Sequence, residues 1–274
     1  MQQYNYWGYG TNEPPAHLKS KKQLSEIGLA PANPVGFIDT KKYTLYLYDP
    51  DLLDSAKPKR EPTPKQLENL KKGRAKSQYR AWYRNGGFVE EDRARTVGWA
   101  RELLEKGTLI LDTETTGLGN AEIVEIAIIN HQGETLLNTL VQPTIEIPGE
   151  VIAIHGITNE MVRNAPSFPE IYPKIKEVLA DNTIAIYNAD ADMGFLRYCC
   201  KLHGLKSLKL RDRTVDLMEY YACWYGEYSS YWRDYKWQPL NGGHRALSDC
   251  LAALEVLKEM AADDPQMRVP DFGC

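Results

Sequence analysis

The sequence predicts an α/β fold in which a mixed central sheet is flanked by helices and is preceded by a smaller basic appendage. Three apolar runs, 109–117, 123–129 and 134–141, have the composition of β-strands, and His131-Gln132-Gly133 forms a turn that joins the last two as a hairpin. Helical patterns and one further strand then alternate near Glu160 and across 169–180, 183–187 and 192–203. Such a mixture is typical of a sheet covered by helices.

The first hundred residues have a different organisation. Residues 1–36 are rich in Tyr, Gly, Pro and Asn and are expected to form an irregular arm, whereas 37–48 favours β-structure around a turn at 39–42. One helix is expected from Pro64 to about Arg84, where Asn85-Gly86-Gly87 ends it, and another over 90–106. We therefore predict four parts: an N-terminal arm with a short β element (1–56), a basic helical segment (57–106), a larger α/β domain (107–262) and a C-terminal tail (263–274).

Composition narrows the class of protein. The chain has 274 residues, of which 43% are hydrophobic and 26% charged, so it has enough apolar sequence for an extensive core. No apolar run is long enough to span a bilayer and the polar N-terminus is not a secretory signal, so we expect no membrane role. The cysteines form no Cys-x-x-Cys pair, which favours buried free thiols and a cytoplasmic setting; they are Cys199, Cys200, Cys223, Cys250 and Cys274.

Charge is distributed unevenly along the chain. Residues 1–100 carry 17 Lys and Arg against 11 Asp and Glu, a net charge of +6, whereas residues 101–274 carry 16 against 26, a net charge of −10. An acidic domain that gathers carboxylates around a metal would need help to hold a polyanion, and a basic appendage could provide it.

The basic charge is densest between residues 57 and 84, where ten Lys and Arg accompany two acids and three aromatic residues. The candidate nucleic-acid contacts there are Lys71, Lys72, Arg74 and Lys76. An equally supported interpretation is a solvated helix that packs its aromatic residues on the larger domain.

The residues that indicate chemistry begin in the first strand of the larger domain. Within Leu-Ile-Leu-Asp-Thr-Glu-Thr-Thr-Gly, the two acids Asp112 and Glu114 are two positions apart. Alternate residues of a strand point to the same face, so both carboxylates should project together from a buried sheet. Two like charges are strongly unfavourable there unless a cation lies between them, which predicts a divalent metal site. The acids of the next strand, Glu122 and Glu125, are expected to be structural or solvent-facing.

Two later segments supply further candidate ligands. After the strand that ends at Tyr187, Asn188 makes a turn and Asp192 lies on the apolar face of the helix that follows. Asp249 lies on the apolar stripe of the last helix, and His244 precedes it in a Gly-rich loop. Each residue alone could be a helix-start acid or an ordinary loop histidine.

Taken together, the three segments resemble the motifs of the DEDDh 3′–5′ exonucleases, the DnaQ-like family with a ribonuclease H-like fold. Asp-x-Glu on a strand, Asn-Ala-x-x-Asp opening a helix and His-x-x-x-x-Asp opening a later one occur in the family's order and spacing over 107–262. The segment Ile-His-Gly-Ile-Thr around His155 is similar to a loop that lies near the substrate in that family.

The resemblance implies a mechanism and a set of roles. Asp112, Glu114, Asp192 and Asp249 would hold two divalent ions, Mg²⁺ or Mn²⁺, and His244 would accept the proton of the attacking water. The product would be a nucleoside 5′-monophosphate released from a free 3′ end. Residues expected to frame the terminal nucleotide are Thr115, Thr116, Gly117, Leu118, His155 and Asn188.

Several alternatives remain open at this point. DNA is favoured as substrate, but an RNA-trimming exoribonuclease of the same family or an inactive nucleic-acid-binding subunit would carry similar motifs. The chain could also serve as the trimming subunit of a polymerase or another nucleic-acid-processing complex. The aromatic stretch 220–237 should border the site, where packing is favoured for most of its rings and base stacking is the alternative.

Overall fold

The computed structural model describes residues 1–8, 10–264 and 270–272, so part of the predicted tail 263–274 lies outside the described residues. The chain separates into two compact units, Met1–Arg74 and Ala75–Cys274. The boundary falls inside helix α2 (Pro64–Trp82). The four parts predicted from the sequence have boundaries that differ from that of these two units, and they stay a prediction.

The first unit is built on two small sheets. A four-stranded sheet has the order β1-β4-β5-β2, and β3 pairs with β6. The bounds of its elements are Gln2–Tyr4 (β1), Lys19–Ser20 (β2), Lys21–Glu26 (α1), Leu29–Pro31 (β3), Gly36–Asp39 (β4), Thr44–Tyr48 (β5) and Ala56–Pro58 (β6). The β-structure predicted over 37–48 is confirmed, with β4 and β5 paired antiparallel.

The expectation of an irregular arm over 1–36 is wrong, because β1, β2, α1 and β3 lie there. Ser20 and Gln23 form a reciprocal capping box that starts α1. The helix then buries Leu24 completely, in a small cluster with Tyr48 and Ala56. The composition of residues 1–36 is typical of a loop and gave no indication of this capping box.

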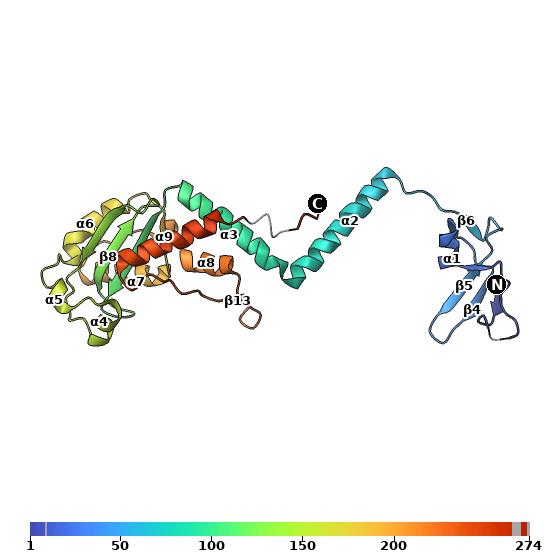
Figure 1. Cartoon of the computed structure of the whole chain (residues 1–274), viewed down its shortest axis with the longest axis horizontal. Helices are drawn as coiled ribbons and strands as arrows, with labels where there is room; N and C mark the ends of the chain where they lie inside the picture. Colours follow the sequence, from blue (N-terminus) through green and yellow to red (C-terminus); the bar gives the residue numbers. More distant parts are fainter. Residues whose placement is uncertain (9, 265–269, 273–274) are drawn as a thin grey trace. The chain divides into compact units, whose positions relative to one another are not determined.

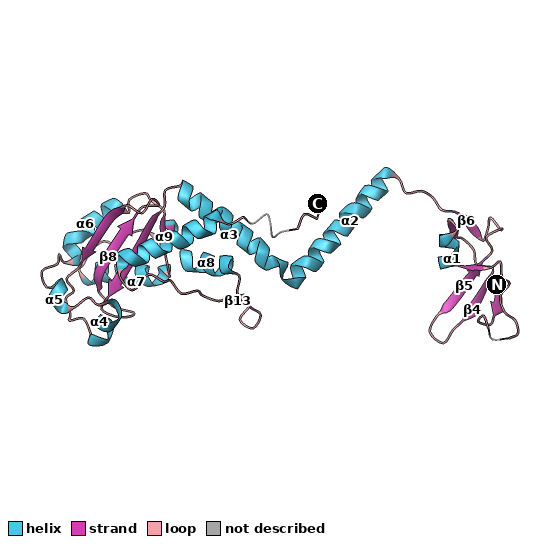
Figure 2. Ribbon diagram, in the orientation of Figure 1, coloured by secondary structure: helices cyan, strands magenta, loops and turns pink. Residues whose placement is uncertain are grey.

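The second unit contains the predicted mixed sheet, with strand order β11-β10-β7-β8-β9 (Figure 2). Its strands are β7 (Leu109–Thr115), β8 (Ile123–Ile129), β9 (Thr135–Leu140), β10 (Ile184–Ile186) and β11 (Thr214–Asp216). Strand β8 pairs antiparallel with both neighbours, whereas β10 runs parallel to β7 and β11. β8 therefore runs opposite to the other four strands, which is the predicted ribonuclease H-like arrangement.

Helices cover both faces of this sheet (Figure 1). Their bounds are Phe88–Glu105 (α3), Gly149–His155 (α4), Asn159–Val162 (α5), Phe168–Val178 (α6), Ala189–Leu202 (α7), Leu217–Tyr225 (α8) and Ala246–Ala262 (α9). Helices α6 and α7 pack with Leu109, Leu111 and β8 on one face, and α3, α8 and α9 pack with Ile110 and Ala127 on the other. The alternation along β7 therefore directs Asp112 and Glu114 to the side of α9.

The helices predicted near Glu160 and over 64–84, 90–106, 169–180 and 192–203 are confirmed, although α7 begins earlier, at Ala189. Between α2 and α3 the chain turns at Asn85 and Gly86, and Gly86 has a φ of 102°, as the predicted helix end requires. Helices α4 and α8, strand β11 and the hairpin of β12 (Tyr228–Ser229) and β13 (Asp234–Tyr235) were not predicted.

Two class-level expectations can be compared with the described residues. Among them, no helix combines the length and the apolar character that crossing a bilayer would require. Cys199, Cys200, Cys223 and Cys250 are free thiols and three of these are buried, as expected. Cys274 lies outside the described residues.

Candidate active site

The predicted acids of β7 meet one acid of α9. Carboxylate oxygens of Asp112, Glu114 and Asp249 lie within 4.8 Å of one another. Asp112 and Glu114 project from β7 toward α9, and Asp249 lies one turn into that helix. Three of the four predicted acidic ligands therefore lie together, and their role as metal ligands stays a prediction.

The electrostatics of this cluster are unfavourable without a cation. Burial, then the charges of Asp192 and Asp249, raises the pKa of Asp112 well above its ordinary value. Burial, then the charges of Asp249 and Glu125, raises the pKa of Glu114 to about 7. Burial also raises the pKa of Asp249. The site therefore holds negative charge that a positive ligand would stabilise.

Asp192 approaches the cluster from the opposite face of the sheet. It lies in the first turn of α7 and is 5% exposed. The Thr113 hydroxyl donates a hydrogen bond of 2.6 Å to its Oδ1. Burial raises the pKa of Asp192 to about 7, while this hydrogen bond acts in the opposite direction. Asp192 is outside the three-acid group but close enough to raise the pKa of Asp112.

The loop that precedes α9 packs directly on Asp249. A β-carbon added to Gly242 would lie 1.7 Å from Asp249 Oδ1, so only glycine fits at that position. His244, two residues later, has a φ of 57° and an exposed side chain. Its charge and its backbone N–H both act on the Asp249 carboxylate. The predicted base therefore lies beside the acid cluster, in a loop and not on the helix.

The donor set of this cluster fits a hard divalent cation. Its donors are carboxylate oxygens, and the free thiol of Cys250 nearby donates to the backbone oxygens of Ile110 and Ala127. Mg²⁺ and Mn²⁺ prefer oxygen ligands and water, and a cation would relieve the repulsion that raises the pKa values of these acids.

The segment that follows β7 is braced internally. The Thr115 hydroxyl donates to the Gly117 carbonyl at 2.6 Å, and the Thr116 hydroxyl accepts from the Glu122 N–H at 3.0 Å. Leu118 is 94% exposed. The threonine hydroxyls thus shape the loop, and the Leu118 side chain is the part of 115–118 that is open to a ligand.

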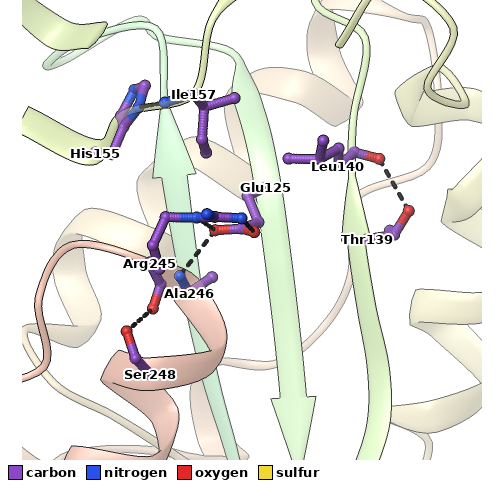
Figure 3. Close-up of polar contacts among 8 residues, drawn as sticks. All are labelled: Glu125, Thr139, Leu140, His155, Ile157, Arg245, Ala246 and Ser248. Carbon is purple, nitrogen blue, oxygen red and sulfur yellow. Dashed lines mark hydrogen bonds and ion pairs between the residues drawn. The ribbon is translucent and has the colours of Figure 1, made fainter. Parts of the chain in front are cut away.

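His155 is a second brace of the same strand end. It is 4% exposed, and its Nδ1 accepts from the Ile157 N–H at 2.9 Å (Figure 3). Its Nε2 lies 3.2 Å from the Thr115 carbonyl. This pattern assigns the proton to Nε2. Burial lowers the pKa of His155. Its predicted part in framing the nucleotide would therefore be indirect, through the Thr115 backbone.

The remaining predicted contacts are exposed. Asn188, with a φ of 66°, makes the turn into α7 and is open to solvent. The four basic candidates Lys71, Lys72, Arg74 and Lys76 are exposed on α2, where Lys72 pairs with Glu68 at 2.8 Å. Their role as nucleic-acid contacts stays a prediction.

The sequence prediction overlooked one ion pair beside the cluster. Glu125 lies opposite Glu114 in the β7–β8 ladder and is 3% exposed, so the structural interpretation of this residue is confirmed and the solvent-facing one is wrong. Its partner is Arg245, at 2.6 Å. A charged residue inside the apolar strand Ile-Val-Glu-Ile-Ala-Ile-Ile could have signalled a buried partner.

The aromatic stretch 220–237 divides into two groups. Tyr220 stacks on Trp99 with ring centroids 3.5 Å apart, and Tyr228 packs against Phe88. Tyr231 and Trp232, at the tip of the β12–β13 hairpin, are 82% and 77% exposed. Packing is thus confirmed for rings of the first group, and base stacking remains open for the two at the tip.

Comparison with known proteins agrees with this geometry. An exonuclease family model, RNase_T, matches residues 109–257. Exonuclease CP81 of Escherichia phage 186 is 39% identical over 179 residues, which cover 59% of this chain and 92% of that protein. DNA polymerase III PolC-type of Bacillus cereus is 27% identical over 172 residues, 60% of this chain but only 12% of the PolC length.

Among solved structures, Escherichia coli exonuclease I in complex with a dA16 oligonucleotide has 15% identity and a TM-score of 0.48, over 59% of this chain and 42% of that one. The match to the family model rests on the segment that contains Asp112, Glu114, His155, Asp192, His244 and Asp249. The chain therefore belongs to the exonuclease family, in its DEDDh, DnaQ-like branch.

Proposed function

We propose that this protein is a metal-dependent 3′–5′ exonuclease that removes nucleoside 5′-monophosphates from a free 3′ end, with DNA as its favoured substrate. The observation that supports it most is the convergence of Asp112, Glu114 and Asp249 within 4.8 Å, with pKa values raised by burial and mutual repulsion. The names of relatives that are DNA polymerase III proteins favour DNA over RNA.

In this proposal, Asp112, Glu114, Asp192 and Asp249 hold two divalent ions, Mg²⁺ or Mn²⁺. Two such ions would neutralise charge on the scissile phosphate and make water a stronger nucleophile at neutral pH. Asp192 would either give up the hydrogen bond from Thr113 in favour of a metal contact, or keep that bond at one carboxylate oxygen and contact a metal through the other oxygen. The exposed imidazole of His244 accepts the proton of the attacking water, as histidine can near neutral pH.

The substrate would be held at the end of β7. Exposed Leu118 would contact the terminal nucleoside, the Thr115–Gly117 backbone would line it, and Asn188 would flank it at the start of α7. His155 would keep the Thr115 carbonyl in place. These roles rest on the burial and hydrogen bonds described above.

The direct test compares end-labelled single-stranded DNA, duplex DNA and RNA with Mg²⁺ and with EDTA. A 5′ label should give a ladder that shortens from the 3′ end, and a 3′ label should be released at once as a mononucleotide. Asp112→Asn serves as the inactive control. Release of the 5′ label first, or equal activity in EDTA, would overturn the proposal. Faster digestion of RNA than of DNA would mean that RNA is the favoured substrate.

We further propose that the exposed basic residues of α2 hold the strand upstream of the cleaved end. Each lost phosphate contact should reduce the salt dependence of binding, because fewer condensed counterions are released. Replacing Lys71, Lys72, Arg74 and Lys76 by Gln should weaken DNA affinity and flatten its salt slope, with little change in turnover at saturation. The matched control replaces four exposed lysines elsewhere by Gln, Lys174, Lys176, Lys201 and Lys258. Equal salt slopes for the two variants would favour α2 as a protein-docking helix.

A second candidate role is the trimming subunit of a polymerase or another nucleic-acid-processing complex, which the names of the polymerase III relatives favour. Size-exclusion chromatography of the full chain with a replicative polymerase would show co-elution if that role is correct. Separate elution at micromolar concentrations would contradict it for that polymerase.

A further inference from the structure

Glu125 and Arg245 form an ion pair (Figure 3), and Glu125 lies opposite Glu114 of the candidate active site in the β7–β8 ladder. Arg245 donates from Nη2 to Glu125 Oε1 at 2.6 Å and from Nε to Oε2 at 3.0 Å. The Ala246 N–H donates to the same Oε2 at 2.9 Å. Both oxygens of a carboxylate that is 3% exposed are therefore used to hold the chain at 245–246.

The carboxylate of Glu125 is paired directly with the guanidinium of Arg245. Glu125 is the cross-strand partner of Glu114, so without a cation it would add one more negative charge to the acid cluster. The two-pronged contact with a planar guanidinium offsets part of that charge, although Glu125 still raises the pKa of Glu114, and it also fixes the direction of the Arg245 side chain. Glu125 is therefore a structural acid that lies beside the proposed metal ligands.

The backbone that the pair holds is the backbone that carries His244. Arg245 is the residue between His244 and the first residue of α9, and its own side chain does not cap the helix. Glu125 satisfies one of the free N–H groups at that helix start from across the structure. The Ser248 hydroxyl donates to the Arg245 carbonyl at 2.9 Å and braces the same residue (Figure 3).

The two predicted functional residues of this region depend on the pair to different degrees. Asp249 is fixed by α9 itself, because the neighbouring Ala246, Cys250 and Ala253 are buried against the sheet. His244 lies outside the helix at a φ of 57°, and its side chain is exposed. Its position beside Asp249 therefore depends on its own backbone contact with that carboxylate and on how Arg245, the residue that follows it, is held.

We propose that Glu125 and Arg245 are positioning residues that hold His244 over the acid cluster. This inference rests on the proposed role of His244 as the base. Displacing a catalytic group by about 1 Å can reduce turnover by roughly 10²-fold. Loosening the pair should thus reduce kcat, whereas substrate binding at the end of β7 and on α2 should remain close to normal.

The experiment uses Glu125→Gln and Arg245→Lys in the full chain, assayed with Mg²⁺. Glu125→Gln keeps the shape of the side chain, and Arg245→Lys keeps the charge but loses the two-pronged contact. We expect kcat to fall about 10- to 100-fold in the first and about 10-fold in the second, with KM changed by less than about threefold. Arg245→Lys keeps the charge balance, so it provides a readout if Glu125→Gln does not fold.

The matched control is Glu122→Gln. Glu122 is equally buried, at 4% exposed, and its carboxylate accepts the Thr144 N–H at 2.9 Å and the Thr144 hydroxyl at 2.6 Å. Removing its charge should lower thermal stability by a similar amount but leave kcat near the wild-type value. A comparable loss of kcat in this control would mean that the effect of Glu125→Gln is general destabilisation, and would overturn the proposal.

A double-mutant cycle separates positioning from a merely structural role. If the pair acts through His244, Glu125→Gln should reduce activity by less than about twofold in a His244→Ala background. The same factor in both backgrounds would overturn the positioning role. If His244→Ala alone retains full activity, the proposed base itself is wrong. If His244→Ala is impaired and Glu125→Gln is not, only the present inference fails.

Discussion

On one side of the acid cluster, Asp112 and Glu114 belong to β7, a strand paired with β10 on one edge and β8 on the other. On the other side, His244 lies in a loop whose attachment to the sheet passes through the ion pair of Arg245 with Glu125. The strand side is held by many backbone hydrogen bonds and a buried core. The loop side is held by a few polar contacts between residues 120 positions apart.

The two sides therefore have different proposed roles, metal binding for the strand and proton transfer for the loop. Strand β7 holds Asp112 and Glu114 so close together that a cation is needed to relieve their repulsion. The positions of these charges are therefore determined by the sheet. The loop carries the group that must move a proton, and its position can be adjusted by a few side chains. Substitutions should therefore affect the two sides differently, in activity and in stability.

The largest effect is expected from Asp112→Asn. Losing one charged ligand should reduce turnover by about 10³-fold, because the proposed metals supply several kcal/mol of transition-state stabilisation. The same change should raise the melting temperature in EDTA, since it removes a charge whose pKa is raised by burial and repulsion. Activity assays and thermal melts in EDTA check this. Asp190→Asn, an exposed acid of α7 outside the cluster, should change neither.

A smaller effect is expected on the loop side from Gly242→Ala. The added β-carbon would lie 1.7 Å from Asp249 Oδ1 and 2.6 Å from its Cγ, so the loop or the carboxylate must move. We expect turnover to fall about 10- to 100-fold. Gly98→Ala on α3 has open space around it and should be neutral or stabilising by about 0.5–1 kcal/mol. Unchanged turnover in Gly242→Ala would show that the loop tolerates displacement.

The same comparison explains which parts were predictable from sequence. Strand β7 and its acids follow from alternation along an apolar run, and Asp192 and Asp249 follow from helical spacing, because these are local patterns. The pairing of Glu125 with Arg245 joins two segments far apart in sequence, and no local periodicity signals it. Likewise, the capping box of Ser20 and Gln23 was hidden by a composition typical of loops.

A third prediction concerns pH in the absence of metal. Glu114 and Asp192 have folded-state pKa values of about 7, above their values in an unfolded chain. Between about pH 4 and 7 the unfolded chain loses these protons before the folded one, so the free energy of unfolding should fall as pH rises. We expect a loss of about 2 kcal/mol between pH 5 and 8, discounted because Glu114 is partly exposed.

Urea denaturation in EDTA at the two pH values measures this loss. Mg²⁺ should reduce it, because a cation binds and stabilises the ionised folded state. Asp112→Asn should also reduce it by removing one interacting charge. A free energy of unfolding that rises with pH in EDTA would contradict the assignment of buried, mutually repelling acids.

The smallest effect should come from Thr113→Val, which sharpens the comparison within the strand side. The Thr113 hydroxyl donates to Asp192 Oδ1 at 2.6 Å and favours its ionised form. Valine keeps the β-branched shape that suits the strand but removes the donor. The pKa of Asp192 should therefore rise further, and fewer molecules should carry the ionised ligand at pH 7. We expect the Mg²⁺ concentration for half-maximal activity to increase about two- to fivefold at pH 7. At about pH 8.5, where Asp192 is ionised in both proteins, the difference should nearly vanish.

Thr139→Val on β9 is the matched control, since its hydroxyl donates only to the Leu140 carbonyl (Figure 3). A defect in Thr113→Val that persists at high pH would mean that the hydroxyl orients Asp192 instead of tuning its ionisation.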